Sequence, residues 1–334
     1  MVHIEAAPVG VPVRDTIGLA DTRNMSTPLY AAITLGSNSF NMLVAQKQGD
    51  QDVVVAKYKR KVRLAEGIEA DGLLNDEVMQ RGLDCLAMFA EMLQKEGVQS
   101  EYVAVIATAT LRNIANAAEF CERALTILGH EIEIISGLKE AEYIYRGMAA
   151  TTPGAAQRLV IDIGGASTEF IIGQADEALF KTSLKMGSVT FTQRFFEQRP
   201  YQLSQFDDAA AEVELILADN RQLLLQTGWQ GVVGASGAVQ SVLEVLAARN
   251  LFSQDQTHEI ALQNLYQLRQ EILKSQMTDL SDIEGLSAER APTFAGGVAI
   301  LVALFELLDI ESLQLSGGAL REGVLQMLRQ RLPQ

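Results

Sequence analysis

The sequence predicts an α/β protein built from two duplicated domains with a cleft between them. Residues 159–173 predict a β-hairpin, because two apolar runs flank a tight turn of small residues. Residues 33–45 align on residues 161–173 without gaps, so that Gly36 falls on Gly164 and Ser39 falls on Ser167. The length of 334 residues is enough for two domains, each with its own core. The repeat and the length together indicate a duplication of one α/β unit.

The first half of the chain predicts alternating strands and helices. A hairpin over residues 29–45 is followed by a strand over 51–64, which continues the same sheet. Asn75 is a typical N-cap residue, and the apolar side chains that follow it at spacings of four and three predict a helix to Glu96. The remaining expected elements are a strand over 102–106, a helix over 116–129, a strand over 132–135 and a helix that begins at Leu138.

The second half repeats this scheme after residues 151–154, whose Thr-Thr-Pro-Gly sequence is typical of a domain joint. We therefore expect a disordered arm at 1–28, in which Met25 is a second candidate for the initiator, a first domain at 29–150 and a second domain at 151–334. After the hairpin we expect strands over 178–185, from 231 and from 313, and helices over 188–196, 206–227, 238–248, 259–274, 295–308 and 320–332.

The turn of the hairpin at 159–173 is suited to bind an oxyanion. Glycine lets the backbone bring its N–H groups close to an anion, and serine and threonine add hydroxyl donors. The carboxylates of Asp162 and Glu169 flank the turn, and a phosphate site tolerates them only if a cation lies between. The pattern predicts a phosphate loop with a metal site, and the alternative is a glycine-rich turn with an incidental aspartate. The residues of the turn expected to bind phosphate are Gly164, Gly165, Ala166, Ser167 and Thr168.

Similar loops follow the other expected strands. The turn at 107–112 offers the Thr110 hydroxyl and the planar Arg112 guanidinium to a phosphate. In the first copy of the repeat, Thr34 stands where the second copy has Asp162. Because ligand sites of open α/β sheets lie at strand ends, we expect these loops to share one cleft. The further phosphate-binding candidates are Gly36, Ser37, Asn38 and Ser39 in the first copy, and Gly234, Ser236 and Gly237 after the strand from 231.

The charge balance limits the range of partners. The formal net charge is −15, whereas broad nucleic-acid binding needs a basic surface that displaces counterions, so we expect no DNA partner. Residues 57–63 nevertheless concentrate five cations, which can bind a polyanion. The alternative for this run is a solvated edge strand protected by its charge.

The sequence also predicts a cytoplasmic protein without a membrane partner. No stretch approaches the roughly 20 uncharged apolar residues that span a bilayer, and the N-terminus lacks a signal-peptide pattern. Cys85 and Cys121 are isolated from each other, which argues against a disulfide framework or a zinc site.

Six short segments carry a family resemblance: Leu-Gly-Ser-Asn-Ser-Phe at 35–40, Ala-Thr-Ala-Thr-Leu-Arg at 107–112, Ile-Ile-Ser-Gly at 134–137, Asp-Ile-Gly-Gly-Ala-Ser-Thr-Glu at 162–169, Gly-Ala-Ser-Gly at 234–237 and Gly-Gly-Ala-Leu-Arg-Glu-Gly at 317–323. With them the chain resembles, over about 29–332, the Ppx/GppA family of exopolyphosphatases and guanosine pentaphosphate phosphatases. Ala166 and Gly317 resemble the guanosine pentaphosphate branch. The resemblance implies actin-like, ribonuclease H-like domains.

The family resemblance also implies a reaction and its residues. Water removes the terminal phosphate of guanosine pentaphosphate or inorganic polyphosphate, with Mg²⁺ or another divalent cation required. Glu140 matches the proposed general base, although its place in a first helical turn also suits the helix dipole. Arg112 would hold the terminal phosphate, and Asp162 and Glu169 match metal-associated carboxylates. Related proteins suggest a homodimer.

The sequence departs from the family pattern in three ways, and the first two favour an alternative function. Thr34 replaces an expected aspartate, and Lys139 and Glu142 invert the charges that usually flank the base. The third departure is that the chain stops after the two-domain core, without the C-terminal helical domains of longer members, which argues against tight binding of long polyphosphate. The alternative is a catalytically weakened protein that binds the nucleotide or polyphosphate, and a sugar kinase or ATPase ranks third because the fold alone does not fix the function.

Overall fold

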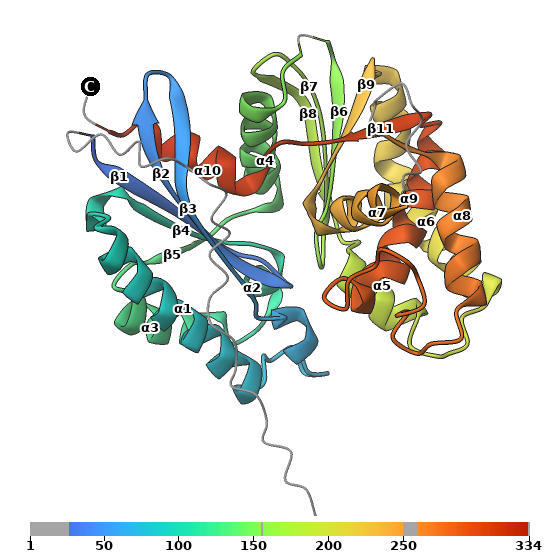
Figure 1. Ribbon diagram of the computed structural model, residues 1–334, viewed down its shortest axis with the longest axis horizontal. Coiled ribbons are helices and arrows are strands. Elements are labelled where there is room, and N and C mark those ends of the chain that lie inside the picture. Colours follow the sequence, from blue (N-terminus) through green and yellow to red (C-terminus); the bar gives the residue numbers. More distant parts are fainter. Residues whose placement is uncertain (1–26, 155, 250–258, 333–334) are drawn as a thin grey trace, which may run out of the picture.

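The computed structural model describes residues 27–154, 156–249 and 259–332 as two lobes (Figure 1). Apart from residues 27 and 28, the arm expected at 1–28 lies outside the described residues, and so does Met25. Each lobe contains a mixed β-sheet, and helices pack against both sheets. The fold is therefore α/β with two sheets, as predicted.

The two sheets share one topology. In the first sheet the order is β3-β2-β1-β4-β5, and in the second it is β10-β11-β9-β6-β7-β8. In both, an antiparallel meander of three strands is followed by a fourth strand parallel to the first of the meander, which confirms the duplication. The strands are β1 (Leu29–Leu35), β2 (Ser39–Gln48), β3 (Gln51–Lys61), β4 (Val103–Ala107), β5 (Ile132–Ile134), β6 (Arg158–Ile163), β7 (Thr168–Gln174), β8 (Glu177–Leu184), β9 (Gly231–Ala235), β10 (Glu259–Ala261) and β11 (Ser312–Leu315).

The helices follow the predicted pattern with small shifts at their ends. The Asn75 side chain caps α1 by accepting a hydrogen bond from the backbone N–H of Val78, as expected. One prediction was wrong: the helix expected over 259–274 begins at Leu262, because residues 259–261 pair with β11 as a short edge strand. The helices are α1 (Asp76–Glu96), α2 (Ala109–Asn113), α3 (Ala117–Leu128), α4 (Gly137–Thr151), α5 (Ser188–Phe195), α6 (Leu203–Thr227), α7 (Ser236–Ala248), α8 (Leu262–Lys274), α9 (Phe294–Leu308) and α10 (Leu320–Arg329).

Helix α9 lies at the centre of the second core. All its residues except Glu306 and Leu307 are buried. The segment Ala291–Leu308 has the length and composition of a membrane span, contrary to the expectation that no stretch approaches that limit. Because 78% of this segment is buried inside the protein, packing in the core accounts for its apolar composition.

Helix α10 returns to the first lobe. Its buried side chains Val324, Leu325 and Leu328 form one apolar cluster with Tyr30 of β1 and Leu43 of β2. Figure 1 shows α10 beside α4, between the two sheets, whereas α1 and α3 cover the outer face of the first sheet. This arrangement differs from the expected division of the chain, which assigned all of 151–334 to a second domain. The apolar stripe of α10 packs on a face of β1 and β2 that α1 and α3 leave open.

Two glycines allow α4 and α10 to cross at close range. A Cβ atom on Gly147 of α4 would clash with the backbone carbonyl of Ala319, and one on Gly323 of α10 would clash with the carbonyl of Tyr143. The two passages of the chain between the lobes also meet here. The backbone N–H of Gly317 donates to Thr152 Oγ1 at 2.9 Å. The lobes are therefore joined by two adjacent segments and a tight helix crossing.

Candidate active site

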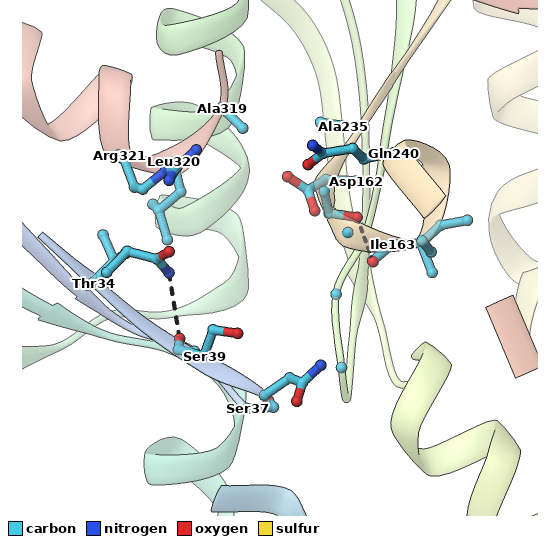
Figure 2. A pocket seen from close by; sticks show the side chains of 18 of the residues that line it. Thr34, Ser37, Ser39, Asp162, Ile163, Ala235, Gln240, Ala319, Leu320 and Arg321 are labelled. Carbon is cyan, nitrogen blue, oxygen red and sulfur yellow. Dashed lines mark hydrogen bonds between the residues drawn. The ribbon is translucent and has the colours of Figure 1, made fainter. Parts of the chain in front are cut away.

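A cavity of about 440 Å³ lies between the lobes and is lined by both of them. Figure 2 shows Thr34, Ser37 and Ser39 of the first lobe facing Asp162 and neighbouring residues of the second. The Glu140 side chain of α4 contributes to the same lining. The structure thus brings the loops after β1, β6 and β9 to one cleft.

The two repeated loops have the same backbone conformation. The N–H of Gly36 donates to the carbonyl of Ser39 at 3.1 Å, and the N–H of Gly164 donates to the carbonyl of Ser167 at 2.9 Å. The tips of the loops also touch across the cleft, since a Cβ atom on Gly165 would lie 2.8 Å from Cβ of Ser37. Small residues at these positions let two backbones approach one ligand.

Most of the phosphate-binding candidates line the cavity, but four do not. Thr168 donates its hydroxyl to the carbonyl of Met186 at 2.7 Å, so its oxygen is directed into the core. Gly234 lies within β9, and Thr110 Oγ1 is buried without a hydrogen-bond partner. Ala166 is the fourth. The candidates that do line the cavity are Gly36, Ser37, Asn38, Ser39, Gly164, Gly165, Ser167, Ser236 and Gly237.

The loop after β9 holds a strained residue at the start of α7. Ser236 has a φ of 77°, a left-handed conformation that is uncommon for a residue other than glycine. Its Oγ donates to the carbonyl of Ile163 at 2.5 Å. This bond ties the start of α7 to the end of β6, and therefore fixes two walls of the cavity relative to each other.

Three buried carboxyl groups gather at the base of the cleft. Asp162 and Glu169 are paired directly across β6 and β7, so their side chains share one face of the sheet. Burial raises the pKa of Glu140 to about 7 and that of Asp162 to about 6. Burial, together with the charges of Glu140 and Asp162, raises the pKa of Glu169 well above its ordinary value. The three carboxylates therefore lie close together, and the positive side chains around them do not offset the effect of burial on their pKa values.

The carboxyl groups differ in their access to the cleft. Glu140 and Asp162 line the cavity, whereas Glu169 is 1% exposed and accepts a hydrogen bond from Ser183 Oγ at 2.7 Å. Among the described residues, no group of three or more His, Cys, Asp or Glu side chains could hold a metal ion by itself. Oxygen donors of this kind suit Mg²⁺, which is usually held by one or two carboxylates together with substrate phosphates. The residues present fit such a shared site.

Arg112 lies beside the general-base candidate and does not line the cavity. Its Nη1 donates to the carbonyl of Ile135 at 2.6 Å and lies 3.4 Å from Glu140 Oε2. The guanidinium opposes the effect of burial on the pKa of Glu140. The bond to Ile135 and the contact with Glu140 fix the guanidinium beside that carboxylate, and the predicted contact of Arg112 with the terminal phosphate stays a prediction. Arg112 is placed to orient that carboxylate.

The altered residues around Glu140 also lie outside the cavity lining. Glu142 forms ion pairs with Lys139 at 3.3 Å, with Arg146 at 2.8 Å and with Lys181 at 3.5 Å. Although burial opposes it, these cations hold the pKa of Glu142 below its ordinary value. The inverted charges thus compensate each other away from the cavity lining.

The basic run at 57–63 divides between two faces of the edge strand β3. Side chains alternate along a strand. Lys59 and Lys61 line the cavity, whereas Arg60 points to the opposite face, where its Nε lies 3.2 Å from Met88 Sδ. The run is therefore both an edge strand and a source of positive charge in the cleft.

Several polar lining residues were not predicted from the sequence. Gln240 follows the small-residue loop by one helical turn, and Arg321 follows the glycines at 317–318, so both stand near loops that were predicted. Arg290 carries no comparable signal, because it lies in an irregular segment after α8. Only the tertiary arrangement brings it to the cavity.

We expect activity to depend on Glu140 ionisation. Because a general base must be unprotonated, kcat/KM for phosphate release is expected to fall as the pH drops through about 7. In Arg112→Gln the midpoint should move to higher pH, since the guanidinium that favours the carboxylate is gone. Initial rates of phosphate release between pH 5 and pH 9 measure this. An unchanged midpoint in Arg112→Gln would show that another group controls the profile.

The sequence matches the Ppx/GppA phosphatase family over residues 43–331. A guanosine-5'-triphosphate,3'-diphosphate pyrophosphatase of Vibrio cholerae is 46% identical over 310 residues, which make up 93% of this chain and 61% of that protein. The protein of the same name from Aliivibrio fischeri is 47% identical over 297 residues, or 89% of this chain and 58% of that protein. The chain thus spans about three fifths of the length of these curated relatives.

A solved structure shows the same architecture. An exopolyphosphatase from Cytophaga hutchinsonii superposes with a TM-score of 0.80 at 26% sequence identity. The match covers 90% of this chain and 98% of that protein. A two-lobed molecule of this size is therefore found elsewhere in the group.

Proposed function

The chain belongs to the Ppx/GppA phosphatase family, and from this premise we propose that it hydrolyses the terminal phosphoanhydride bond of guanosine pentaphosphate and of inorganic polyphosphate. The observation that carries the proposal is the position of Glu140. This buried carboxyl group lies in a cleft between two phosphate loops, and its raised pKa suits a general base. The names of the relatives support the two substrate classes, with guanosine pentaphosphate first.

The residues divide the work as phosphoryl transfer requires. The loops at 36–39 and 164–167 present backbone N–H groups and hydroxyls to the phosphate oxygens, and Ser236 and Gly237 complete the cradle. Glu140 accepts a proton from the attacking water, whose oxygen bonds to the terminal phosphorus as the bond to the leaving phosphate oxygen breaks. Arg112 orients Glu140 through its 3.4 Å contact.

Asp162, supported by Glu169, would hold a divalent cation such as Mg²⁺. When bound, the cation would neutralise charge on the phosphate oxygens. Asp162 lines the cavity and Glu169 lies directly opposite it on β7. Burial raises the pKa of both carboxyl groups, so their negative charges are unfavourable in the absence of a cation. A bound cation would offset these charges.

Phosphate release by the purified protein tests the proposal. Guanosine pentaphosphate, short polyphosphate and long polyphosphate are compared with Mg²⁺ and with EDTA. We expect release that requires the cation, with guanosine pentaphosphate as the better substrate. The absence of release from every one of these substrates would overturn the proposed hydrolase.

A weakened binding protein is the second candidate, and Thr34 favours it. This side chain is 3% exposed and lines the cavity at the position that corresponds to Asp162 in the other lobe. Ligand binding without phosphate release by the wild-type protein would support this second function.

We expect Thr34→Asp to raise phosphate release about tenfold at low Mg²⁺, because a second carboxylate would strengthen cation binding. Thr34→Asn is the matched control, since it has the shape of aspartate without its charge. The measurement is the Mg²⁺ dependence of the initial rate. Equal rates in the two variants would show that the first loop does not take part in cation binding.

Other expectations remain predictions. A cytoplasmic location and a homodimer are still proposed, the latter from the family resemblance. The acidic charge of −15 still argues against broad nucleic-acid binding.

A further inference from the structure

We propose that Glu289 is a built-in competitor of the substrate. In the free protein its carboxylate occupies an anion position formed by Lys59 and Lys61, and a phosphate group of the bound substrate replaces it. This inference rests on the proposed phosphoanhydride substrate and adds a residue that controls its access to the cleft.

The geometry places one carboxylate between two cations of the other lobe. Lys59 and Lys61 are two positions apart on β3, so both side chains point into the same cleft. Glu289 Oε1 lies 3.4 Å from Lys61 Nζ and 3.8 Å from Lys59 Nζ. The lysines belong to the first lobe, whereas Glu289 belongs to the segment that precedes α9. The two lysines line the cavity that holds the phosphate loops, and Glu289, which is not part of that lining, reaches them from the other lobe.

The local charge favours a larger anion than one carboxylate. Arg290 also lines the cavity, and burial together with the charge of Arg290 lowers the pKa of Lys59 to about 8. The pKa of Lys61 is lowered as well, mainly by burial. Two lysines face one carboxylate, so Glu289 leaves one positive charge in excess at this position, whereas Arg290 is paired with Glu244 at 3.4 Å. A phosphate group offers more negative charge and three acceptor oxygens.

The contact is also weak enough to be exchanged. The Glu289 side chain is 53% exposed, and exposed ion pairs contribute little to stability because water and salt screen them. An anion carried by the substrate can therefore displace the carboxylate without unfolding the segment around it. A substrate gains from this exchange only if it extends from the phosphate loops as far as β3, so Glu289 selects for extended polyanions.

The first test is the effect of Glu289→Gln on the kinetics with polyphosphate. We expect KM to fall about fivefold, the size of an exposed ion-pair contribution, and kcat to stay within about twofold. Glu284→Gln is the matched control, because it makes the same change of charge at an exposed position of the same segment. An equal fall of KM in both variants would show a general effect of charge and would overturn the inference.

A double-mutant cycle separates direct competition from other causes. If Glu289 competes by occupying the lysines, its removal should have a much smaller effect in a Lys61→Gln background, where only the 3.8 Å contact with Lys59 remains. We expect Lys61→Gln to raise KM about fivefold and the additional change Glu289→Gln to alter it by less than about twofold. If Glu289→Gln lowered KM about fivefold in the Lys61→Gln background as well, the proposed contact would be overturned.

A binding measurement distinguishes failure of this inference from failure of the proposed function. Isothermal titration of inorganic tripolyphosphate in EDTA follows binding without turnover. Tighter binding to Glu289→Gln than to wild type, with no phosphate release by wild type, would support the competitor and reject the hydrolase. Equal binding to both proteins, with phosphate release by wild type, would support the hydrolase and overturn the competitor.

Discussion

Replacing Glu140 by glutamine is expected to lower kcat for phosphate release about 10³-fold, while KM changes little. General-base catalysis by a positioned side chain contributes about 10²-fold to 10⁴-fold, and glutamine removes the basic oxygen while keeping the shape of the side chain. The carboxyl group is buried and its pKa is raised to about 7, so the neutral amide suits its surroundings. Steady-state kinetics with saturating Mg²⁺ measure the effect.

The control for this variant is Glu142→Gln on the same helix. Glu142 does not line the cavity, and its ion pairs among the described residues are with Lys139 and Arg146 of α4 and with Lys181 of β8. We expect its kcat to stay within about twofold of wild type, since exposed ion pairs have small effects. Full activity of Glu140→Gln with an unchanged unfolding temperature would assign the base to another residue.

Gly147→Ala is expected to lower the free energy of unfolding by about 3 kcal/mol, the upper end of the usual range for overpacking. The added Cβ would clash with the backbone carbonyl of Ala319, which cannot move without shifting the start of α10. Gly323→Ala should act similarly, because its Cβ would clash with the carbonyl of Tyr143. Urea unfolding at equilibrium measures the change.

The matched control for the helix crossing is Gly231→Ala. No heavy atom lies within 4 Å of a Cβ atom built on Gly231, so we expect a change of less than about 1 kcal/mol there. If Gly147→Ala were as stable as this control, the crossing of α4 and α10 would be looser than the structure shows.

The local parts of the fold and site could be predicted from the sequence. The hairpins at 33–45 and 161–173 have apolar runs on both sides of a turn of small residues, and these features act over a few residues. Asn75 capped α1 as expected because capping depends on neighbours three residues away. The role of Glu140 as general base was predicted from the family resemblance, since a glutamate in a first helical turn has no distinctive pattern of its own.

The parts that depend on long-range packing could not be predicted. The alternation of β3 decides that Lys59 and Lys61 face the cleft, but only the position of the second lobe brings Glu289 to them. The hydrogen bond from Arg112 to the carbonyl of Ile135 joins residues 23 positions apart, and no local pattern indicates it. The return of α10 to the first lobe likewise depends on a face of β1 and β2 that no local pattern reveals.

The return of α10 has a consequence for biosynthesis. The inner face of the first sheet is completed by Val324, Leu325 and Leu328, which leave the ribosome after the whole of the second lobe. Until these residues have been translated, Tyr30 and Leu43 lack part of the apolar cluster that buries them. The first lobe is therefore begun first and finished last, and part of its apolar inner face stays uncovered on the nascent chain until α10 has been made.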